Sequence, residues 1–313
     1  MITNITIKRI VRFCISFIII GGLIYYLWRH WDTFYIAIDA SWYHILSLAL
    51  CILVTWVLSS CQFLLFLRKT GLEVGFWENM LLFIATALGN YLPMRFGSLL
   101  RMRYFKQAHG LRYGKFGGIM GVRTLILLIS TGILGCIGMV GLNLSGFSLN
   151  VTVLAIFISM VVISLCAYLI PAPRLKNPEN FFLKVWSDLF AGLRLIQSQP
   201  VLLWQVVVLV LMQMAMLAIR LYITFSAIQV ELSPWALLVL APSTVLISFL
   251  SLTPGNLALR EWAIGLISLA AGLDFSSGIF AGTLDRAVLL ACIFFFGSVS
   301  LIYIYAILSR EKS

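Results

Sequence analysis

Long apolar segments fill most of this chain and limit what it can fold into. Nine of them occur in its 313 residues, at 11–28, 42–67, 79–93, 117–141, 150–171, 201–229, 235–253, 258–272 and 279–308. Hydrophobic residues make up 62% of the chain and charged residues 11%, whereas soluble domains have about 45–50% and about 25%. Because a spanning helix needs about 20 apolar residues, the sequence predicts an all-α polytopic membrane protein with about seven to nine membrane segments. We expect one transmembrane domain over residues 1–313, without a soluble catalytic domain.

Basic residues orient the chain, because they concentrate on the cytoplasmic side of a membrane. Lys8, Arg9 and Arg12 precede the first apolar run, and no small-residue cleavage site follows it, so we expect a retained helix rather than a signal peptide. Arg310 and Lys312 close the chain. Both termini are therefore expected in the cytoplasm.

The stretch 94–116 is too basic for an external loop. It has no acidic residue and six basic ones, which are Arg95, Arg101, Arg103, Lys106, Arg112 and Lys115. The sequence therefore predicts a re-entrant hairpin, in which helix 79–92 breaks at Pro93 and an amphipathic helix over 97–108 returns. Gly97 either permits a close approach of the backbone or eases the turn. Such a break is tolerated at membrane depth only where protein buries it or where it lines a wet cavity.

A second predicted hairpin joins 235–253 to 258–272. Its break lies at Pro254, Gly255 and Asn256. A spanning pair and a re-entrant pair both leave the C-terminus inside, so both arrangements remain open for this hairpin.

The two halves of the chain share an order of features. From the break proline to a Gly-Leu pair there are 17 residues in the first half and 18 in the second, and an arginine follows that glycine after 13 and 14 residues. The sequence therefore predicts a first repeat at 42–141 and a second at 201–308, joined by a cytoplasmic linker at 172–200 with a surface helix near 180–197. The two repeats run in opposite senses, as in transporters with inverted repeats and broken helices.

Ionisable residues inside apolar runs mark candidate functional positions, since each costs about 2.5–3.5 kcal/mol on insertion scales. They are Arg123, Arg220, Arg260, Glu261, Asp285 and Arg286. Arg123 and Arg286 either extend to the surface or bind a headgroup or ion partner. Arg220 is predicted to extend to the outer surface.

Neighbouring charged residues suggest further contacts. Asp285 and Arg286 point about 100° apart on a helix, and we expect them to pair with other helices. Glu261 follows the second break, where a helix dipole favours it. The arginines Arg95, Arg101 and Arg103 suit either an anionic lipid surface or a phosphate site, because guanidinium groups match phosphate geometry.

Other classes of chemistry lack the residues that they require. The six cysteines lie in apolar runs without a CxxC, and the three histidines are scattered, so neither a metal site nor a cofactor is expected. No plausibly placed Ser/His/Asp set and no HExxH motif occurs, which argues against an enzyme. The absence of a nucleotide motif argues against direct use of ATP. The net charge of +11 is explained by cytoplasmic loops and lipid contact rather than by nucleic acid.

Two short motifs resemble the lysylphosphatidylglycerol synthase transmembrane-region family, also called flippase-like. The first is carried by Pro93, Gly97, Arg101, Gly110 and Arg123, and the second by Pro254, Gly255, Glu261, Gly272 and Arg286. The chain departs from the pattern at Ser98 and Val122, where the family often has acidic residues, and at Ala258, where it has a glycine. The resemblance implies translocation of lipids or of lipid-linked intermediates, without the soluble aminoacyl-transfer domain of the synthase members.

We therefore expect a transporter in a bacterial inner membrane that moves a phosphate-bearing lipid, either an anionic phospholipid or a polyprenyl-phosphate-linked species. The expected substrate-binding residues are Arg95, Arg101, Arg123, Glu261, Asp285 and Arg286, and the expected hairpin breaks are Pro93, Gly97, Pro254, Gly255 and Asn256. The alternative is a non-transporting scaffold or partner of lipid or glycan synthesis enzymes, and a lipid-modifying enzyme is a third reading. Passive and coupled transport both remain open.

Overall fold

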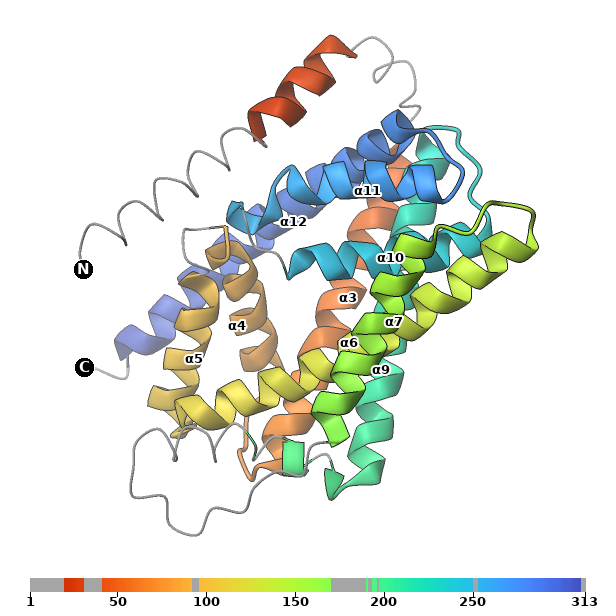
Figure 1. Ribbon diagram of the computed structural model, residues 1–313. Helices are drawn as coiled ribbons and strands as arrows, with labels where there is room; N and C mark the ends of the chain where they lie inside the picture. The colour runs from red at the N-terminus through yellow and green to blue at the C-terminus, as the bar shows by residue number, and fades with distance from the viewer. Residues whose placement is uncertain are drawn as a thin grey trace, which may run out of the picture.

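The described residues fold into a bundle of helices joined by turns and loops, and none of them forms a strand (Figure 1). The computed structural model describes residues 20–30, 41–91, 96–169, 190, 193–195, 197–249 and 253–310. Residues 20–29 form a helix, and the named helices after it are α3 (Trp42–Lys69), α4 (Phe76–Gly89), α5 (Phe96–His109), α6 (Tyr113–Leu144), α7 (Val151–Leu169), α9 (Pro200–Ala227), α10 (Pro234–Ser248), the short 3-10 helix η2 (Pro254–Asn256), α11 (Leu259–Ala270) and α12 (Phe275–Arg310).

These helices follow the apolar runs of the sequence. Within the described residues, α3, α6, α7, α9 and α12 are long and apolar enough to cross a membrane, and α4 and α10 are shorter apolar helices. The prediction of an all-α membrane protein is therefore confirmed. Pro93, Arg95 and most of the helix expected at 180–197 lie outside the described residues.

Helices α4 and α5 form a hairpin, and they contact each other both far from the break and beside it. The ring of His109, at the end of α5, lies 2.6 Å from the carboxylate of Glu78, in the first turn of α4. At the other end, the side chain of Asn90 accepts a hydrogen bond from the backbone N–H of Ser98 at 3.1 Å. A Cβ at Gly97 would overlap the backbone of α4, so only glycine permits this close approach. At 1.5 Å per residue, the 14 residues of α4 span about 21 Å, which is less than the roughly 30 Å of a bilayer core.

Helices α10 and α11 form the second hairpin, around η2. Gly255, Asn256 and Ala258 have φ angles of 59°, 56° and 65°, and these left-handed conformations reverse the chain direction. The amide of Asn256 donates to the carbonyl of Ser248, near the end of α10, at 2.9 Å. Both breaks therefore have an asparagine side chain that bonds backbone groups left free by the helix ends.

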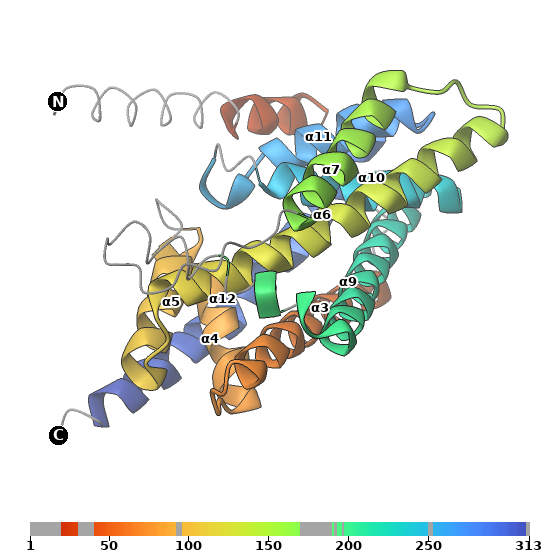
Figure 2. The ribbon, with the colours of Figure 1, turned by 60° about the horizontal axis from the view of Figure 1, so that its bottom comes forward.

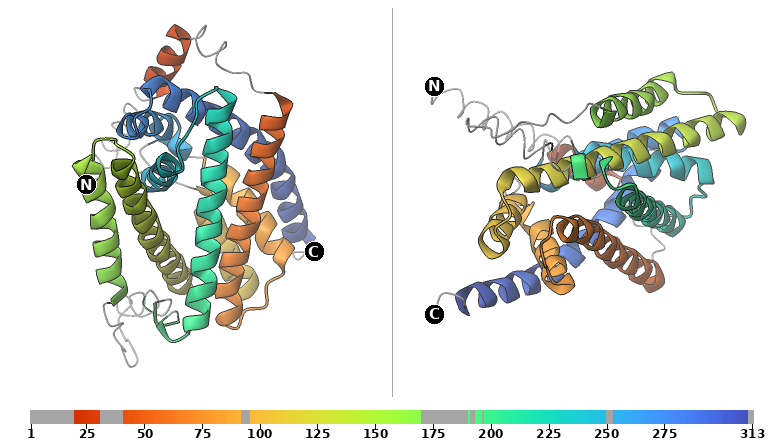
Figure 3. Two further views of the ribbon diagram at one scale, coloured as in Figure 1. Left: turned by 90° about the vertical axis from the view of Figure 1, so that its right-hand side faces the viewer. Right: turned by 90° about the horizontal axis from the view of Figure 1, so that it is seen from below.

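Each hairpin packs against the helix that follows the other hairpin. Helix α12 packs on α4, α6 packs on α10, and α3 lies beside α9 (Figures 2 and 3). Small residues allow these close approaches, as is usual between membrane helices. Gly138 of α6 meets the backbone of Leu238 in α10, and Gly135 lies against the ring of Phe157 in α7.

Both Gly-Leu pairs of the sequence occupy helix ends. Gly110 and Gly272 follow α5 and α11 with φ angles of 66° and 77°. The N–H groups of Leu111 and Leu273 donate back to carbonyls in the last part of the same helices, at 3.1 and 2.9 Å. A left-handed glycine with a returning N–H is a common helix C-cap, which explains why the pair occurs after both helices.

Candidate functional site

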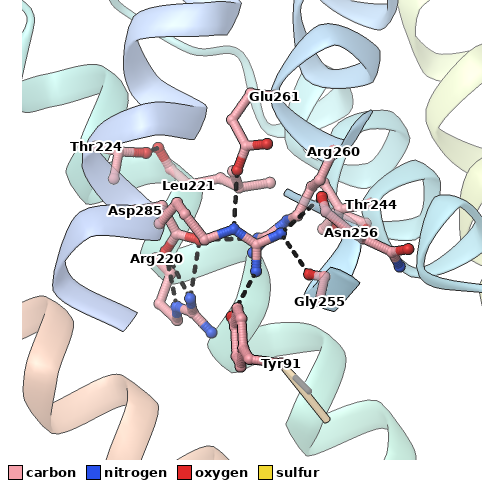
Figure 4. A network of polar contacts seen from close by, with 12 residues as sticks. Tyr91, Arg220, Leu221, Thr224, Thr244, Gly255, Asn256, Arg260, Glu261 and Asp285 are labelled. Atoms are coloured by element: carbon pink, nitrogen blue, oxygen red, sulfur yellow. Dashed lines mark hydrogen bonds and ion pairs between the residues drawn. The ribbon is translucent and has the colours of Figure 1, made fainter. Parts of the chain in front are cut away.

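Two groups of polar side chains are buried inside the bundle. The second-hairpin cluster contains Arg220, Arg260, Glu261, Asp285 and Arg286, and Figure 4 shows it from close by. The first-hairpin cluster contains Ser60, Gln62, Asn79, Arg101, Arg123 and Gln213. The two clusters differ in how their charges are balanced.

Asp285 is the negative centre of the second-hairpin cluster. It lies on α12 with no exposed surface. Arg220 of α9 binds it at two points, with Nε donating at 2.9 Å and Nη2 at 2.8 Å. Arg260 of α11 approaches the same carboxylate at 2.8 Å. One carboxylate therefore joins three helices and leaves an excess of one positive charge.

Arg286 connects the two hairpins. Its Nε donates to Glu261 of α11 at 2.9 Å, and its Nη1 donates to the hydroxyl of Tyr91, just after α4, at 3.0 Å. Its Nη2 donates to the carbonyls of Gly255 and Asn256 at 3.1 and 3.0 Å (Figure 4). The guanidinium thus holds the second break next to the end of α4.

The local sequence explains this division of partners. Asp285 and Arg286 are adjacent on α12, so their side chains point in different directions. Each pairs with other helices, as predicted: Asp285 with α9 and α11, and Arg286 with α11. Glu261 lies in the first turn of α11, where the helix dipole stabilises a carboxylate. Its second oxygen, Oε2, is buried without a partner.

The prediction that Arg220 extends to the outer surface is wrong. Its side chain is only 6% exposed, and it pairs with the fully buried Asp285. Two hydrogen bonds to a carboxylate replace the water that the guanidinium would otherwise have to reach.

Arg101 is the most deeply buried charge of the first-hairpin cluster. It is 2% exposed, and its Nη2 donates to the side-chain oxygen of Asn79 at 3.0 Å. Asn79 in turn donates to the hydroxyl and the carbonyl of Ser60 at 2.8 and 2.9 Å. The guanidinium carbon lies 4.0 Å from the ring centre of Phe63 and 5.4 Å from that of Phe83. Aromatic faces attract this cation, but they do not neutralise it.

Arg123 lies on α6 in the same cluster. Its Nε donates to the side-chain oxygen of Gln62 at 2.7 Å, and Gln213 of α9 reaches the same oxygen at 3.3 Å. The charges of Arg101 and Arg123 repel each other. In the part of the chain that the structure describes, neither arginine has a carboxylate within 4 Å.

The structure separates the residues expected to bind substrate into these two clusters. Glu261, Asp285 and Arg286 lie together beside the break residues Gly255 and Asn256. Two others, Arg101 and Arg123, lie in the first-hairpin cluster. Arg95 is not among the described residues.

Sequence reasoning missed several members of the clusters. Arg220 and Arg260 were named as ionisable residues in apolar runs, which cost free energy to insert, but they were left out of the expected substrate-binding set. The amides Gln62 and Asn79 and the hydroxyl of Tyr91 gave no comparable signal, because such residues cost less to bury. Within the described residues, no three His, Cys, Asp or Glu side chains are grouped so that they could hold a metal ion.

Comparisons with known proteins give one match. A family model described as "Lysylphosphatidylglycerol synthase TM region" matches residues 10–297. No curated protein and no solved structure matches the chain.

Proposed function

The chain belongs to the lysylphosphatidylglycerol synthase transmembrane-region family, and on this premise we propose that it translocates a phosphate-bearing lipid or lipid-linked intermediate across the membrane. The family and the apolar helices make it an integral membrane protein. The match covers a membrane region, which is compatible with a protein that binds and moves lipid without catalysing a reaction.

The single observation that carries the proposal is the contact between the two broken hairpins at Arg286. This guanidinium bonds Tyr91 beside the first break and Gly255 and Asn256 in the second. Helical breaks inside a membrane are tolerated where they line a path or are covered by protein. In transporters with paired broken helices, the substrate site lies between them.

The charge of the two clusters supports a phosphate headgroup as the substrate. Together they hold five arginines and two carboxylates. Arginine binds phosphate oxygens with paired, charge-assisted hydrogen bonds. In the proposed mechanism Glu261 and Asp285 balance part of this charge, the headgroup passes between the hairpins, and the lipid tails stay in the bilayer.

The packing supports two inverted repeats, 42–141 and 201–308, as part of the proposal. Helix α12 packs on α4 as α6 packs on α10, and α3 pairs with α9. These are the pairings expected if α3, α4 and α6 correspond to α9, α10 and α12. We propose that the α4–α5 hairpin is re-entrant and that the basic segments face the cytoplasm of a bacterial inner membrane, as do both termini.

A vesicle assay tests the proposal. Purified protein is placed in phosphatidylcholine vesicles with a trace of fluorescent phosphatidylglycerol, and a membrane-impermeant reductant bleaches the outer leaflet. Protein-free vesicles should bleach by about half, because only one leaflet is accessible, whereas vesicles with translocating protein should bleach nearly completely. Arg101→Ala and Arg286→Ala should slow the second phase.

The matched control is Arg112→Ala, which removes the same charge from an exposed position between α5 and α6. It should translocate lipid like the wild type. If the wild-type vesicles bleach like protein-free ones with each phosphate lipid tried, translocation is rejected. Copurification of one lipid or glycan synthesis enzyme would then favour the scaffold.

A further inference from the structure

The unpartnered polar atoms of the two clusters differ in kind. In the first-hairpin cluster they are donors, Arg101 Nε and Gln62 Nε2. In the second-hairpin cluster it is an acceptor, Glu261 Oε2, and the break residue Asn256 beside it has a second one, Oδ1. A buried donor without an acceptor carries the cost of its lost hydration. Among the described residues, the first-hairpin cluster therefore lacks acceptors for these two donors, and it contains no carboxylate.

The two arginines of the first-hairpin cluster lie over neighbouring residues of α3. Arg101 stacks on Phe63, and Arg123 bonds Gln62. Gln62 has no exposed surface, and Arg101 is 2% exposed, so bulk water does not reach their free N–H groups. Arg123 is only half-buried, which leaves the cluster reachable from one side.

In the second-hairpin cluster, by contrast, the protein supplies its own anions. Arg286 donates hydrogen bonds to Glu261, to one hydroxyl and to two carbonyls. Asp285 forms ion pairs with Arg220 and Arg260. An external phosphate would have to displace these groups. From Arg101 or Arg123 it would displace no carboxylate of the residues that the structure describes.

From this difference we infer that Arg101, Arg123 and Gln62 form a buried binding site for a phosphate oxyanion. The anion supplies acceptors to Arg101 Nε and Gln62 Nε2 and offsets the repulsion between the two guanidiniums. Asn79 holds Arg101 in place, and the ring of Phe63 covers one face of its guanidinium. This deepens the proposed function and rests on it for one point, that the phosphate belongs to a lipid headgroup. Arg286 then acts as a link between the hairpins rather than as a ligand.

Gln62→Glu is the sharpest test, because it should weaken phosphate binding without lowering the stability of the protein. The new carboxylate keeps the shape of the amide and places a negative charge where Arg123 Nε already donates at 2.7 Å. It should leave the thermal midpoint unchanged or raise it. It should also weaken phosphate binding by about tenfold or more, since it supplies the charge that the anion would bring.

The binding experiment uses two probes in a maltoside detergent that contains no phosphate. The first is inorganic phosphate, and the second is dioleoyl phosphatidic acid, compared with dioleoylglycerol, which has the same tails without phosphate. Saturable binding is measured by calorimetry or by the shift of the thermal midpoint. The wild type and the control Arg112→Ala should bind phosphatidic acid alike, and neither should bind dioleoylglycerol.

The outcomes separate the source of the phosphate from the existence of the site. Binding of phosphatidic acid alone, weakened in Gln62→Glu, assigns a lipid headgroup. Binding of inorganic phosphate, weakened in the same variant, supports the site for a free anion. Equal binding by Gln62→Glu and wild type, or no binding of either probe, overturns the inference. If Gln62→Glu does not fold, Arg123→Gln replaces it, with the same expected loss.

The vesicle assay keeps this inference distinct from the proposed function. Loss of binding in Gln62→Glu together with wild-type protein that moves no lipid would keep the site and reject translocation. Rapid translocation by Gln62→Glu would keep the function and reject the site.

Discussion

Asp285→Asn should destabilise the protein strongly, because it removes the negative charge that lies between two buried arginines. Asp285 has no exposed surface, and the side chains of Arg220 and Arg260 are 6% and 11% exposed. Asparagine has nearly the same shape, so the packing around position 285 is kept. The change therefore isolates the loss of charge.

The expected cost is about 3–5 kcal/mol, the usual range when one partner of a buried ion pair is removed and the other stays charged. Surface screening does not reduce this value, since the three groups are enclosed by protein. At roughly 2 °C for each kcal/mol in a chain of this size, the thermal midpoint should fall by about 6–10 °C.

Arg260→Met should cost much less, about 1 kcal/mol, in spite of removing an equally short contact. It leaves Arg220 and Asp285 as a neutral pair with two hydrogen bonds. A larger loss of stability in Asp285→Asn than in Arg260→Met would therefore support the charge argument, because the number of contacts alone does not predict it.

Thermal unfolding can be followed with a dye that fluoresces on reacting with thiols. Cys292, on the same helix as Asp285, is buried and should react only as the bundle opens, whereas the exposed Cys166 sets the starting signal. The control is Asp274→Asn, an exposed carboxylate just before α12. Equal midpoints for Asp285→Asn and this control would refute the reasoning, as would equal losses for Asp285→Asn and Arg260→Met.

Three further predictions use the same unfolding measurement. Gly97→Ala should cost at least about 1–3 kcal/mol by overpacking the α4–α5 hairpin, whereas Gly121→Ala, with open space around it, should be neutral or slightly stabilising. Tyr91→Phe should cost about 1–2 kcal/mol, because Arg286 loses an acceptor at 3.0 Å, and an unchanged midpoint would argue against that contact. Gly110→Ala should cost about 1 kcal/mol, since its φ of 66° strains a residue with a Cβ; a midpoint equal to that of the wild type would contradict a left-handed glycine there.

The helices could be read from the sequence with little error. The apolar run 201–229 corresponds to α9 at Pro200–Ala227, and the helix predicted over 97–108 corresponds to α5 at Phe96–His109. These positions are local properties, because a chain in lipid has to satisfy its backbone groups within each helix. The glycines that follow α5 and α11 marked their ends for the same local reason.

The positions of the two hairpin breaks could be predicted in part from the sequence. Pro254, Gly255 and Asn256 mark the second turn, and the structure places η2 there. The sequence left open whether this pair spans the membrane, since counting the crossings gives the same C-terminus either way. Gly97 suggested a close approach, which the contact of its backbone with α4 confirms.

The pairing of charges needed the tertiary structure. The sequence identified Asp285 and Arg286 as charges that need partners on other helices, but Arg220 was assigned to the surface and is buried against Asp285. The partners lie far away in the sequence. Arg220 is 65 positions from Asp285, and Tyr91 is 195 positions from Arg286. No local pattern specifies which faces of two such helices meet.

By itself, therefore, the sequence determined that this chain is an α-helical membrane protein, where its helices lie and which residues bring charge into them. The physical reason is that lipid imposes the same requirement on each segment separately. The tertiary structure alone decided that Glu261 and Asp285 balance most of the positive charge of the second-hairpin cluster, while Arg101 and Arg123 lie without a carboxylate among the described residues. That difference depends on how helices cross, because the energy of a buried charge is set by the few atoms within hydrogen-bonding distance of it.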